Sequence, residues 1–349
     1  MKKTIQKNIF QILLLAVLIT FAFWFALKDN MDGVIENLKH VSSICIILII
    51  VMGILYYSLQ GYLLFCIARK YQPSITFRDG LKNAYTAAFF NGVTPLGGGQ
   101  VAQTYAFRKL HISYRDIASI LWKDFFLYQS VVVGFAFFLL VTNIALSFST
   151  FSAFIWLIYL GFLINASVIV ILWTMSHFPK LYGKLSDVLV VLLHKLHLIK
   201  NKEATLEKWN AQVHYFSKEV KKLKEDGHLI IKGLIVNLIR QIIYYSIPFV
   251  IGLGLGLPLS FSDLWLILLL SCFIHMLNAL TPLPGDTGWT ETAFILIFSI
   301  AFKRVNASAI MILWRMATYY MAILIGGFTF IRIKMSKDTP LSNDKNATQ

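Results

Sequence analysis

The sequence predicts an all-α polytopic membrane protein, an inverted repeat with two re-entrant broken-helix hairpins and about six to eight transmembrane helices. Three observations support this: an apolar composition, several apolar runs long enough to span a bilayer, and one Pro/Gly-rich segment that occurs twice. Hydrophobic residues make up 57% of the chain and charged residues 14%, and the mean hydropathy is +0.68. Soluble domains are about a quarter charged, so the composition excludes an ordinary soluble protein.

The duplicated segment lies at residues 91–107 and returns 187 positions later, at residues 278–294. It reads NGVTPLGGGQVAQTYAF in the first copy and NALTPLPGDTGWTETAF in the second. The identical positions are Asn91/Asn278, Thr94/Thr281, Pro95/Pro282, Leu96/Leu283, Gly98/Gly285, Ala106/Ala293 and Phe107/Phe294. Similarity at a fixed offset indicates a duplicated architecture. Each copy separates two apolar segments, so we expect two broken helices.

Long apolar runs predict spans at residues 9–27, 41–68, 117–141, 151–175, 229–257 and 305–331. Crossing a hydrocarbon core of about 30 Å takes about 20 residues. The arms of the first hairpin, residues 81–93 and 101–110, are too short to cross, so they should enter the membrane and return. The arms of the second hairpin, residues 264–280 and 289–302, are longer, and hydropathy leaves open whether they cross.

The chain has a net charge of +15, and most of its charged residues lie between the apolar runs. This position favours contact with the anionic inner leaflet over nucleic-acid binding. Basic residues near both termini predict that both lie in the cytoplasm, in a multi-pass protein of the cell membrane. Residues 1–349 form one integral membrane domain, in which repeat one (about 41–141) and repeat two (about 229–331) start on opposite sides.

The one long polar segment, residues 177–228, is expected to be a cytoplasmic loop. Apolar residues recur there at spacings of three and four from Leu206 to Leu223, which predicts an amphipathic helix. Two placements stay open for it. It lies on the membrane interface or pairs with another helix, and the interface is favoured.

The two breaks predict the substrate site. A helix broken at membrane depth is tolerated where it is buried or lines a wet cavity, and the N–H groups of the following half-helix suit a phosphate. The candidate substrate-binding residues are Asn91, Thr94, Gly98, Gly99, Gln100, Gln103, Arg240, Asn278, Thr281, Gly285, Asp286, Glu291 and Arg315. The alternative is that Pro and Gly only form tight turns between packed half-helices.

Two arginines, Arg240 and Arg315, lie deep inside apolar runs. Ionisable residues at that depth are functional candidates. An internal ion pair of Arg315 with Glu291 or Asp286 is the structural alternative. Lys123 and Asp124 lie near the start of a span. At this depth their side chains are expected to extend to the membrane surface, which explains charged residues there without a functional role. No hydrolase, nucleotide-binding or metal-ligand motif is present, so we predict no catalytic residue, metal or cofactor.

Over nearly its whole length the chain resembles the transmembrane domain of lysylphosphatidylglycerol synthases, in particular the stand-alone Gram-positive variant. The residues that carry this resemblance are Thr94, Pro95, Gly98, Gly99, Gln100, Gln103, Tyr105, Tyr128, Gln129, Pro282, Leu283, Pro284, Gly285, Gly288, Glu291, Arg315, Gly326 and Gly327. Asp286 departs from the pattern, which implies a second Gly there. The resemblance also implies that full-length synthases carry a soluble transferase domain, whereas this chain ends 18 residues after its last predicted span.

The resemblance implies a flippase-like carrier that moves a phospholipid or polyprenyl-phosphate headgroup between leaflets. Enzyme activity stays open, with its absence favoured. The alternative is phosphatidylglycerol lysyltransferase-type synthesis of an aminoacyl lipid, linked to cationic antimicrobial peptide resistance. A third hypothesis is a membrane partner or regulator of a lipid-modifying enzyme. The expected partners are membrane phospholipids or polyprenyl-phosphate lipids and no nucleic acid, and a second copy of the chain or a lipid-modifying enzyme stays open.

Overall fold

The computed structural model describes residues 31–94, 97–143, 155–177, 205–207, 218–220, 222–281 and 283–335. Within these residues all regular structure is helical. Four helices are long and apolar enough to cross a membrane: Ser43–Ala68, Tyr114–Thr142, Gly227–Gly254 and Arg304–Met335. The predicted all-α membrane fold is therefore confirmed. The predicted first span, residues 9–27, lies outside the described residues, and the inverted orientation of the repeats stays a prediction.

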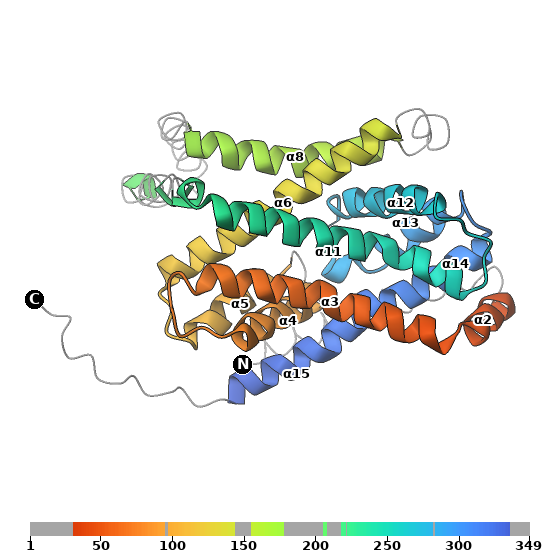
Figure 1. The fold of residues 1–349 in the computed structure, drawn as a ribbon, viewed down its shortest axis with the longest axis horizontal. Helices are drawn as coiled ribbons and strands as arrows, with labels where there is room; N and C mark the ends of the chain where they lie inside the picture. The colour runs from red at the N-terminus through yellow and green to blue at the C-terminus, as the bar shows by residue number, and fades with distance from the viewer. Residues whose placement is uncertain are drawn as a thin grey trace, which may run out of the picture.

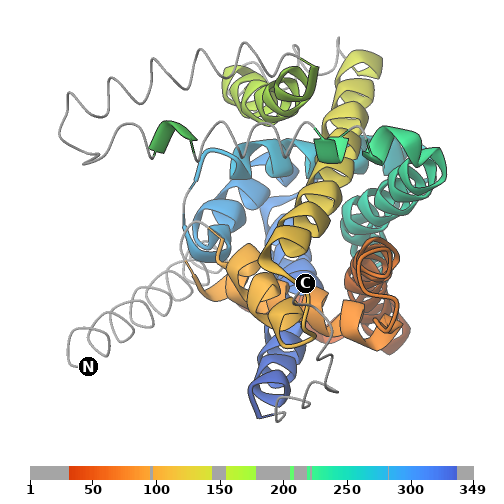
Figure 2. The same cartoon turned by 90° about the vertical axis from the view of Figure 1, so that its left-hand side faces the viewer.

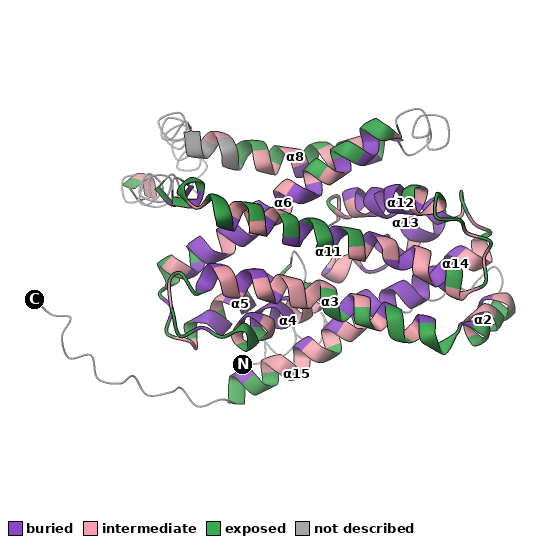
Figure 3. Cartoon of the chain, viewed as in Figure 1, coloured by how far each residue is buried: buried purple, intermediate pink, exposed green. Residues whose placement is uncertain are grey.

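The long helices pack side by side. α3 (Ser43–Ala68) and α11 (Gly227–Gly254) run antiparallel and in contact, and α6 (Tyr114–Thr142) packs on both (Figures 1 and 2). α8 (Ile155–His177) lies on the outside, against α6 and α12. Outward positions of these helices are apolar and exposed, as Ile44 on α3 and Trp156 on α8 illustrate (Figure 3). In a membrane protein such surfaces face lipid.

Two broken-helix hairpins pack among the long helices. In the first, α4 (Phe77–Val93) packs against α5 (Gly99–Arg108). In the second, α12 (Asp263–Asn278) is followed by a short 3₁₀ turn, η1 (Pro284–Asp286), and by α13 (Trp289–Phe298). The second arm of each hairpin has 10 residues. At 1.5 Å per residue this is about 15 Å, half the hydrocarbon thickness, so neither second arm is long enough to cross.

Two local features differ from the sequence prediction. Between the predicted spans 9–27 and 41–68, where the sequence predicts no helix, lies α2 (Met31–His40). Its Val34 is buried in the core, and its Asn37 donates a hydrogen bond to Asn306. The last span consists of α14 (Arg304–Arg315), a π-helical turn η2 (Met316–Tyr320) and α15 (Met321–Met335). Single π-turns inside α-helices occur frequently at functional sites.

The amphipathic helix predicted for residues 206–223 lies mostly outside the described residues. At its described end, Val220 and Leu223 are 7% and 2% exposed. Leu223 belongs to a core cluster with Ile67 and Ile117. This end packs on the protein, and the position of the helix on the membrane interface stays a prediction.

Lys123 does not extend to the surface as the sequence suggested. Its ammonium group lies 3.1 Å from the Glu219 carboxylate, and both side chains are buried. Lys222 and Tyr71 also donate to Glu219. Burial by itself raises the pKa of Glu219, but the hydrogen bonds from Lys222, Tyr71 and Lys123 outweigh it and lower the pKa to about 2. The pair joins the segment around Glu219 to α6.

Candidate functional site

A cavity of about 690 Å³ lies between the two hairpins. Its wall is built from both hairpins together with α3, α6, α11, α14, η2 and α15. The volume is in the range of sites that bind small molecules, about 300–1,000 Å³. The predicted site residues that line it are Asn91, Gln100, Gln103, Arg240, Asn278, Thr281, Gly285, Asp286 and Arg315. Residues separated by more than 200 positions are therefore brought to one place.

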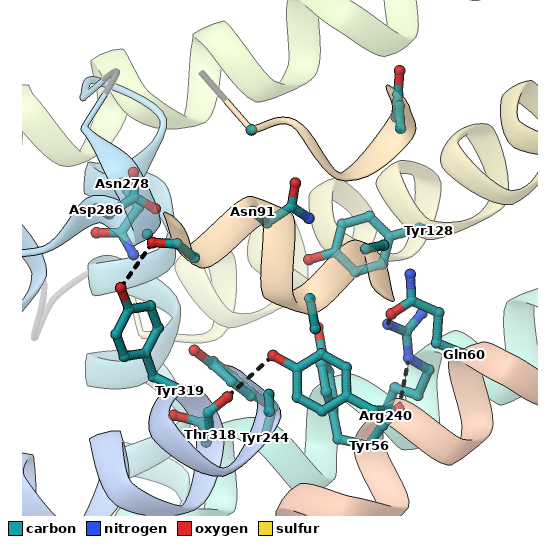
Figure 4. A pocket seen from close by; sticks show the side chains of 18 of the residues that line it. Tyr56, Gln60, Asn91, Tyr128, Arg240, Tyr244, Asn278, Asp286, Thr318 and Tyr319 are labelled. Carbon is teal, nitrogen blue, oxygen red and sulfur yellow. Dashed lines mark hydrogen bonds between the residues drawn. The ribbon is translucent and has the colours of Figure 1, made fainter. Parts of the chain in front are cut away.

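The polar side chains face one another across this cavity (Figure 4). Asn278 and Asp286 lie on one side with Tyr319, and Arg240 and Gln60 lie on the other. In Figure 4 Asn91 of the first hairpin lies between the two groups.

Arg240 is 2% exposed and makes hydrogen bonds only with neutral acceptors. It donates to the Tyr56 carbonyl at 3.3 Å, to Asn237 Oδ1 at 2.6 Å and to Gln60 Oε1 at 3.2 Å. Its guanidinium also lies over the rings of Tyr56 and Tyr128. Among the described residues no carboxylate forms an ion pair with it. Arg240 shares the cavity with the buried carboxyl of Asp124, with which it interacts electrostatically without forming an ion pair. Its guanidinium can therefore still pair with an anion in the cavity.

Arg315 is held differently. Its Nε lies 2.8 Å from Glu291 Oε1, and the two side chains are 6% and 2% exposed. Its Nη1 donates to the Gly285 carbonyl at 3.3 Å. For Arg315 the internal ion pair with Glu291 is what the structure shows. Glu291 does not line the cavity, whereas Arg315 does.

The first amide groups at the breaks are already occupied. Gly98 N donates to Thr94 Oγ1 at 2.7 Å, and Gly99 N donates to Asn91 Oδ1 at 2.8 Å. In the second hairpin Gly288 N donates to Glu291 at 2.6 Å. These three amides are therefore paired within the breaks, and the binding of a substrate anion by the breaks stays a prediction. The predicted residues Thr94, Gly98, Gly99 and Glu291 shape the breaks and do not line the cavity.

Apart from Arg315 Nε, which is ion-paired with Glu291, three buried polar atoms of cavity residues have no hydrogen-bond partner in the described structure: Gln103 Nε2, Arg315 Nη2 and Asp124 Oδ1. Their residues are 5%, 5% and 8% exposed. An unpaired buried polar group costs about 1–3 kcal/mol. A polar ligand would offset this cost. Asp124 belongs to the cavity, so the interpretation that it extends to the surface is wrong.

Sequence reasoning missed most of the tyrosines and their neighbours. Cavity residues outside the predicted set include Tyr56, Tyr57, Gln60, Asp124, Tyr244, Thr318 and Tyr319, and Tyr128 entered only through the resemblance. One available signal is that Tyr57 and Tyr244 are separated by the repeat offset of 187.

Tyr319 joins the two hairpins directly. Its hydroxyl donates to the Gly92 carbonyl of the first hairpin at 2.9 Å (Figure 4) and lies 3.2 Å from Thr287 Oγ1 of the second. The π-turn η2 carries this residue. One side chain of the last span thus contacts the break region of both hairpins.

The backbone conformation of the second break explains why Asp can stand at position 286, where the resemblance implies Gly. Gly285, Asp286 and Gly288 have φ values of 55°, 52° and 86°. This left-handed region favours Gly, and Asp and Asn are the residues that tolerate it best among the others. The Gly that the resemblance implies at position 286 therefore has a conformational reason, and Asp286 adopts the same conformation.

Gln129, beside Tyr128, has a structural contact. Its Nε2 donates to Asn165 Oδ1 at 2.8 Å, which joins α6 to α8. Gly326 allows α15 to pack directly on α4, because a Cβ there would collide with the Tyr85 carbonyl. These two motif residues therefore position helices around the cavity.

A family model described as "Lysylphosphatidylglycerol synthase TM region" matches residues 8–326. The matched region includes both hairpins and every residue that lines the central cavity. Among curated proteins, none matches the chain.

Proposed function

Because the chain belongs to the lysylphosphatidylglycerol synthase transmembrane-region family, we propose that this membrane protein moves a lipid headgroup between the two leaflets. The headgroup is that of a phospholipid or a polyprenyl phosphate. Both hairpins take part, and the acyl or polyprenyl chain stays in the bilayer while the polar group passes through the protein.

One observation carries the proposal: a polar cavity of about 690 Å³ between two broken helices of a protein whose outer surface is apolar. A headgroup cannot cross hydrocarbon unaided, because its charges lose their hydration. The cavity offers amides, phenol hydroxyls and two arginines in its place. It therefore supplies hydrogen bonds where the lipid would otherwise have none.

Arg240 is the residue best suited to a phosphate. It is buried, charged and bonded only to neutral groups. Arg240 forms no ion pair among the described residues, and Asp124 is the carboxyl group that interacts with it in the cavity. A buried cation without an ion pair is unfavourable by several kcal/mol, and a phosphate would offset this. Arg315 is neutralised by Glu291, so it contributes its remaining N–H group rather than a free charge.

Tyr319 lies where the two hairpins would separate during transport. Its hydroxyl is the contact that both hairpins share. A neutral hydrogen bond contributes about 1 kcal/mol net, which is small enough to be exchanged during transport. We propose that the two hairpins separate at this contact when the cavity opens.

The test is transport by the full chain reconstituted in liposomes that contain a fluorescent phosphatidylglycerol. A membrane-impermeant reductant reports the fraction of the lipid in the outer leaflet over time. We expect faster exchange than in protein-free liposomes, and at least a tenfold loss for Arg240→Gln, because hydrogen bonds to charged groups contribute about 1.5–3 kcal/mol. Arg332→Gln removes an exposed charge outside the cavity and is the matched control.

Two outcomes would count against the proposal. Exchange by Arg240→Gln at the wild-type rate would remove the role of the cavity. Lysyl-phosphatidylglycerol formed by the purified chain from lysyl-tRNA and phosphatidylglycerol, without any exchange, would replace transport by the synthetic alternative.

A further inference from the structure

A second recess lies at the end of the bundle where α3 ends and α11 begins (Figure 1). It has a volume of about 350 Å³, and its wall includes Tyr62, Phe65, Arg69, Lys70, Leu229 and Lys232. We call it the basic groove. It shares no lining residue with the central cavity. Lys232 precedes Arg240 on α11 by eight residues, or about 12 Å along the helix axis, so the two sites are separate.

The basic groove carries an excess of positive charge. Lys70 forms an ion pair with Asp226, whose carboxylate also accepts a hydrogen bond from Leu229 N. Arg69 and Lys232 have no carboxylate partner among the described residues. Two uncompensated cations therefore remain at the groove, and a ligand that binds there should be an anion.

Aromatic side chains hold these cations in place. The rings of Tyr62, Phe65 and Phe77 form a cluster with centroids 6.3–6.4 Å apart. The Arg69 guanidinium lies 5.6 Å from the Phe65 ring centroid, and the Lys232 ammonium lies 5.7 Å from that of Tyr62. Aromatic rings beside basic side chains are typical of the headgroup level of a bilayer.

An exposed apolar surface continues from the groove along α11. Ile231 and Ile235, the neighbours of Lys232 on this helix, are 62% and 53% exposed. A free phosphate would gain nothing from this surface, whereas a lipid would place its acyl chains on it. Basic recesses between membrane helices recognise acidic lipid headgroups in this way.

We propose that the basic groove binds the phosphate of an anionic phospholipid, with the acyl chains against α11. The charge pattern predicts that this end of the bundle faces the cytoplasm. The site does not rest on the transport proposal, because it is built from other residues and would exist in a protein that moves no lipid.

The test measures lipid binding to the purified full chain by native mass spectrometry, with dioleoylphosphatidylglycerol and dioleoylphosphatidylcholine as probes. We expect preferential binding of phosphatidylglycerol and a loss of about 30-fold in Arg69→Gln/Lys232→Gln, since each basic side chain near an anionic lipid contributes about 1 kcal/mol. Arg332→Gln/Lys334→Gln removes the same charge elsewhere and should bind normally. Arg69→Lys/Lys232→Arg keeps the charge and should retain binding, which separates loss of the site from loss of the fold.

Arg240→Gln distinguishes lipid bound in the central cavity from lipid bound in the basic groove. The loss caused by Arg69→Gln/Lys232→Gln should be the same in the Arg240→Gln background as in the wild type, because the two sites share no lining residue. Unchanged phosphatidylglycerol binding by Arg69→Gln/Lys232→Gln would overturn the proposal. It would also be overturned if inorganic phosphate bound to the same residues and displaced the lipid completely, because the ligand would then be the free anion.

Discussion

The two hairpins share a sequence pattern but close their breaks with different chemistry. In the first, Thr94 and Asn91 accept hydrogen bonds from Gly98 N and Gly99 N, so neutral groups of the hairpin itself satisfy the break. In the second, Glu291 accepts from Gly288 N and is paired with Arg315 of α14. The Gly98 and Gly99 amides of the first break are satisfied within the hairpin, whereas the Glu291 that closes the second break is paired with a charge on another helix.

This difference shows that a duplicated sequence does not imply duplicated interactions. Asn91 and Asn278 are equivalent by alignment, yet Asn91 bonds to a backbone amide and Asn278 accepts from Thr290 Oγ1. The ion pair anchors the second hairpin to the last span. Among the described residues the first hairpin has no ion pair at its break, so a movement there separates no opposite charges.

The largest effect expected is at this anchor. Glu291→Gln keeps an oxygen for Gly288 N but leaves Arg315 buried without its partner. We expect a loss of about 3–5 kcal/mol in the free energy of unfolding, because breaking one side of a buried ion pair leaves an uncompensated charge. Unfolding titrations with sodium dodecyl sulfate measure it. The double variant Glu291→Gln/Arg315→Gln should lose less than the sum of the single losses, and additive losses would contradict the coupling.

A smaller effect is expected at the first break. Thr94→Val removes the acceptor for Gly98 N and should cost about 1–3 kcal/mol in the free energy of unfolding. Gly99→Ala should cost a similar amount, because its Cβ would collide with Asn91 Oδ1, the acceptor of the Gly99 amide. The matched control is Thr104→Val, whose hydroxyl makes an exposed bond to a helix carbonyl. If Thr94→Val cost as much as Glu291→Gln, the contrast between the hairpins would fail.

The extent of sequence prediction follows from the same contrast. Gly and Pro mark where a helix breaks, so the residues beside the breaks, such as Asn91 and Asp286, could be placed near a site from local sequence. The inner faces of long spans could not be found in this way. Lipid is as apolar as a protein core, so a spanning helix carries no polar stripe that marks its outer side. On α3, for example, Tyr56 and Gln60 line the cavity, whereas the adjacent Leu55 is exposed on the outside. Which side of α3 faces the cavity is determined by the packing of the helices.

Glu291 shows a second limit. A carboxylate beside a break in a membrane helix predicted a substrate-binding role, and its pairing with Arg315 was the open alternative. The two residues are 24 positions apart, and nothing in either segment fixes that they meet at 2.8 Å. The packing of α13 on α14 determines this. Which buried charge stays free for a ligand is therefore a property of the fold.

The contact that both hairpins share should show a moderate effect. Tyr319→Phe removes the hydroxyl that bonds to Gly92 and Thr287 but keeps the ring against Gly285. We expect a loss of about 1 kcal/mol in the free energy of unfolding and a change in the rate of lipid exchange. Tyr105→Phe is the control, because the Tyr105 ring packs against Phe330 while its hydroxyl has no hydrogen bond to any of the described residues. An unchanged exchange rate would remove Tyr319 from the proposed movement of the hairpins.

The smallest change in the free energy of unfolding is expected at Asp286. Here the second hairpin can be given the residue of the first, because a Gly stands at the aligned position 99. Position 286 aligns with Gly99, and its φ of 52° suits Gly. Asp286→Gly relieves the left-handed strain but adds flexibility to the unfolded chain, so we expect the free energy of unfolding to change by less than about 1 kcal/mol. The two aligned positions therefore respond differently to substitution: Gly is tolerated at position 286, whereas the Cβ of Ala at position 99 collides with Asn91.

The rate of lipid exchange separates the two roles of Asp286. If its carboxylate binds the headgroup, Asp286→Gly and Asp286→Asn should both slow lipid exchange without changing the free energy of unfolding. Normal exchange in both variants would assign Asp286 to the backbone turn alone.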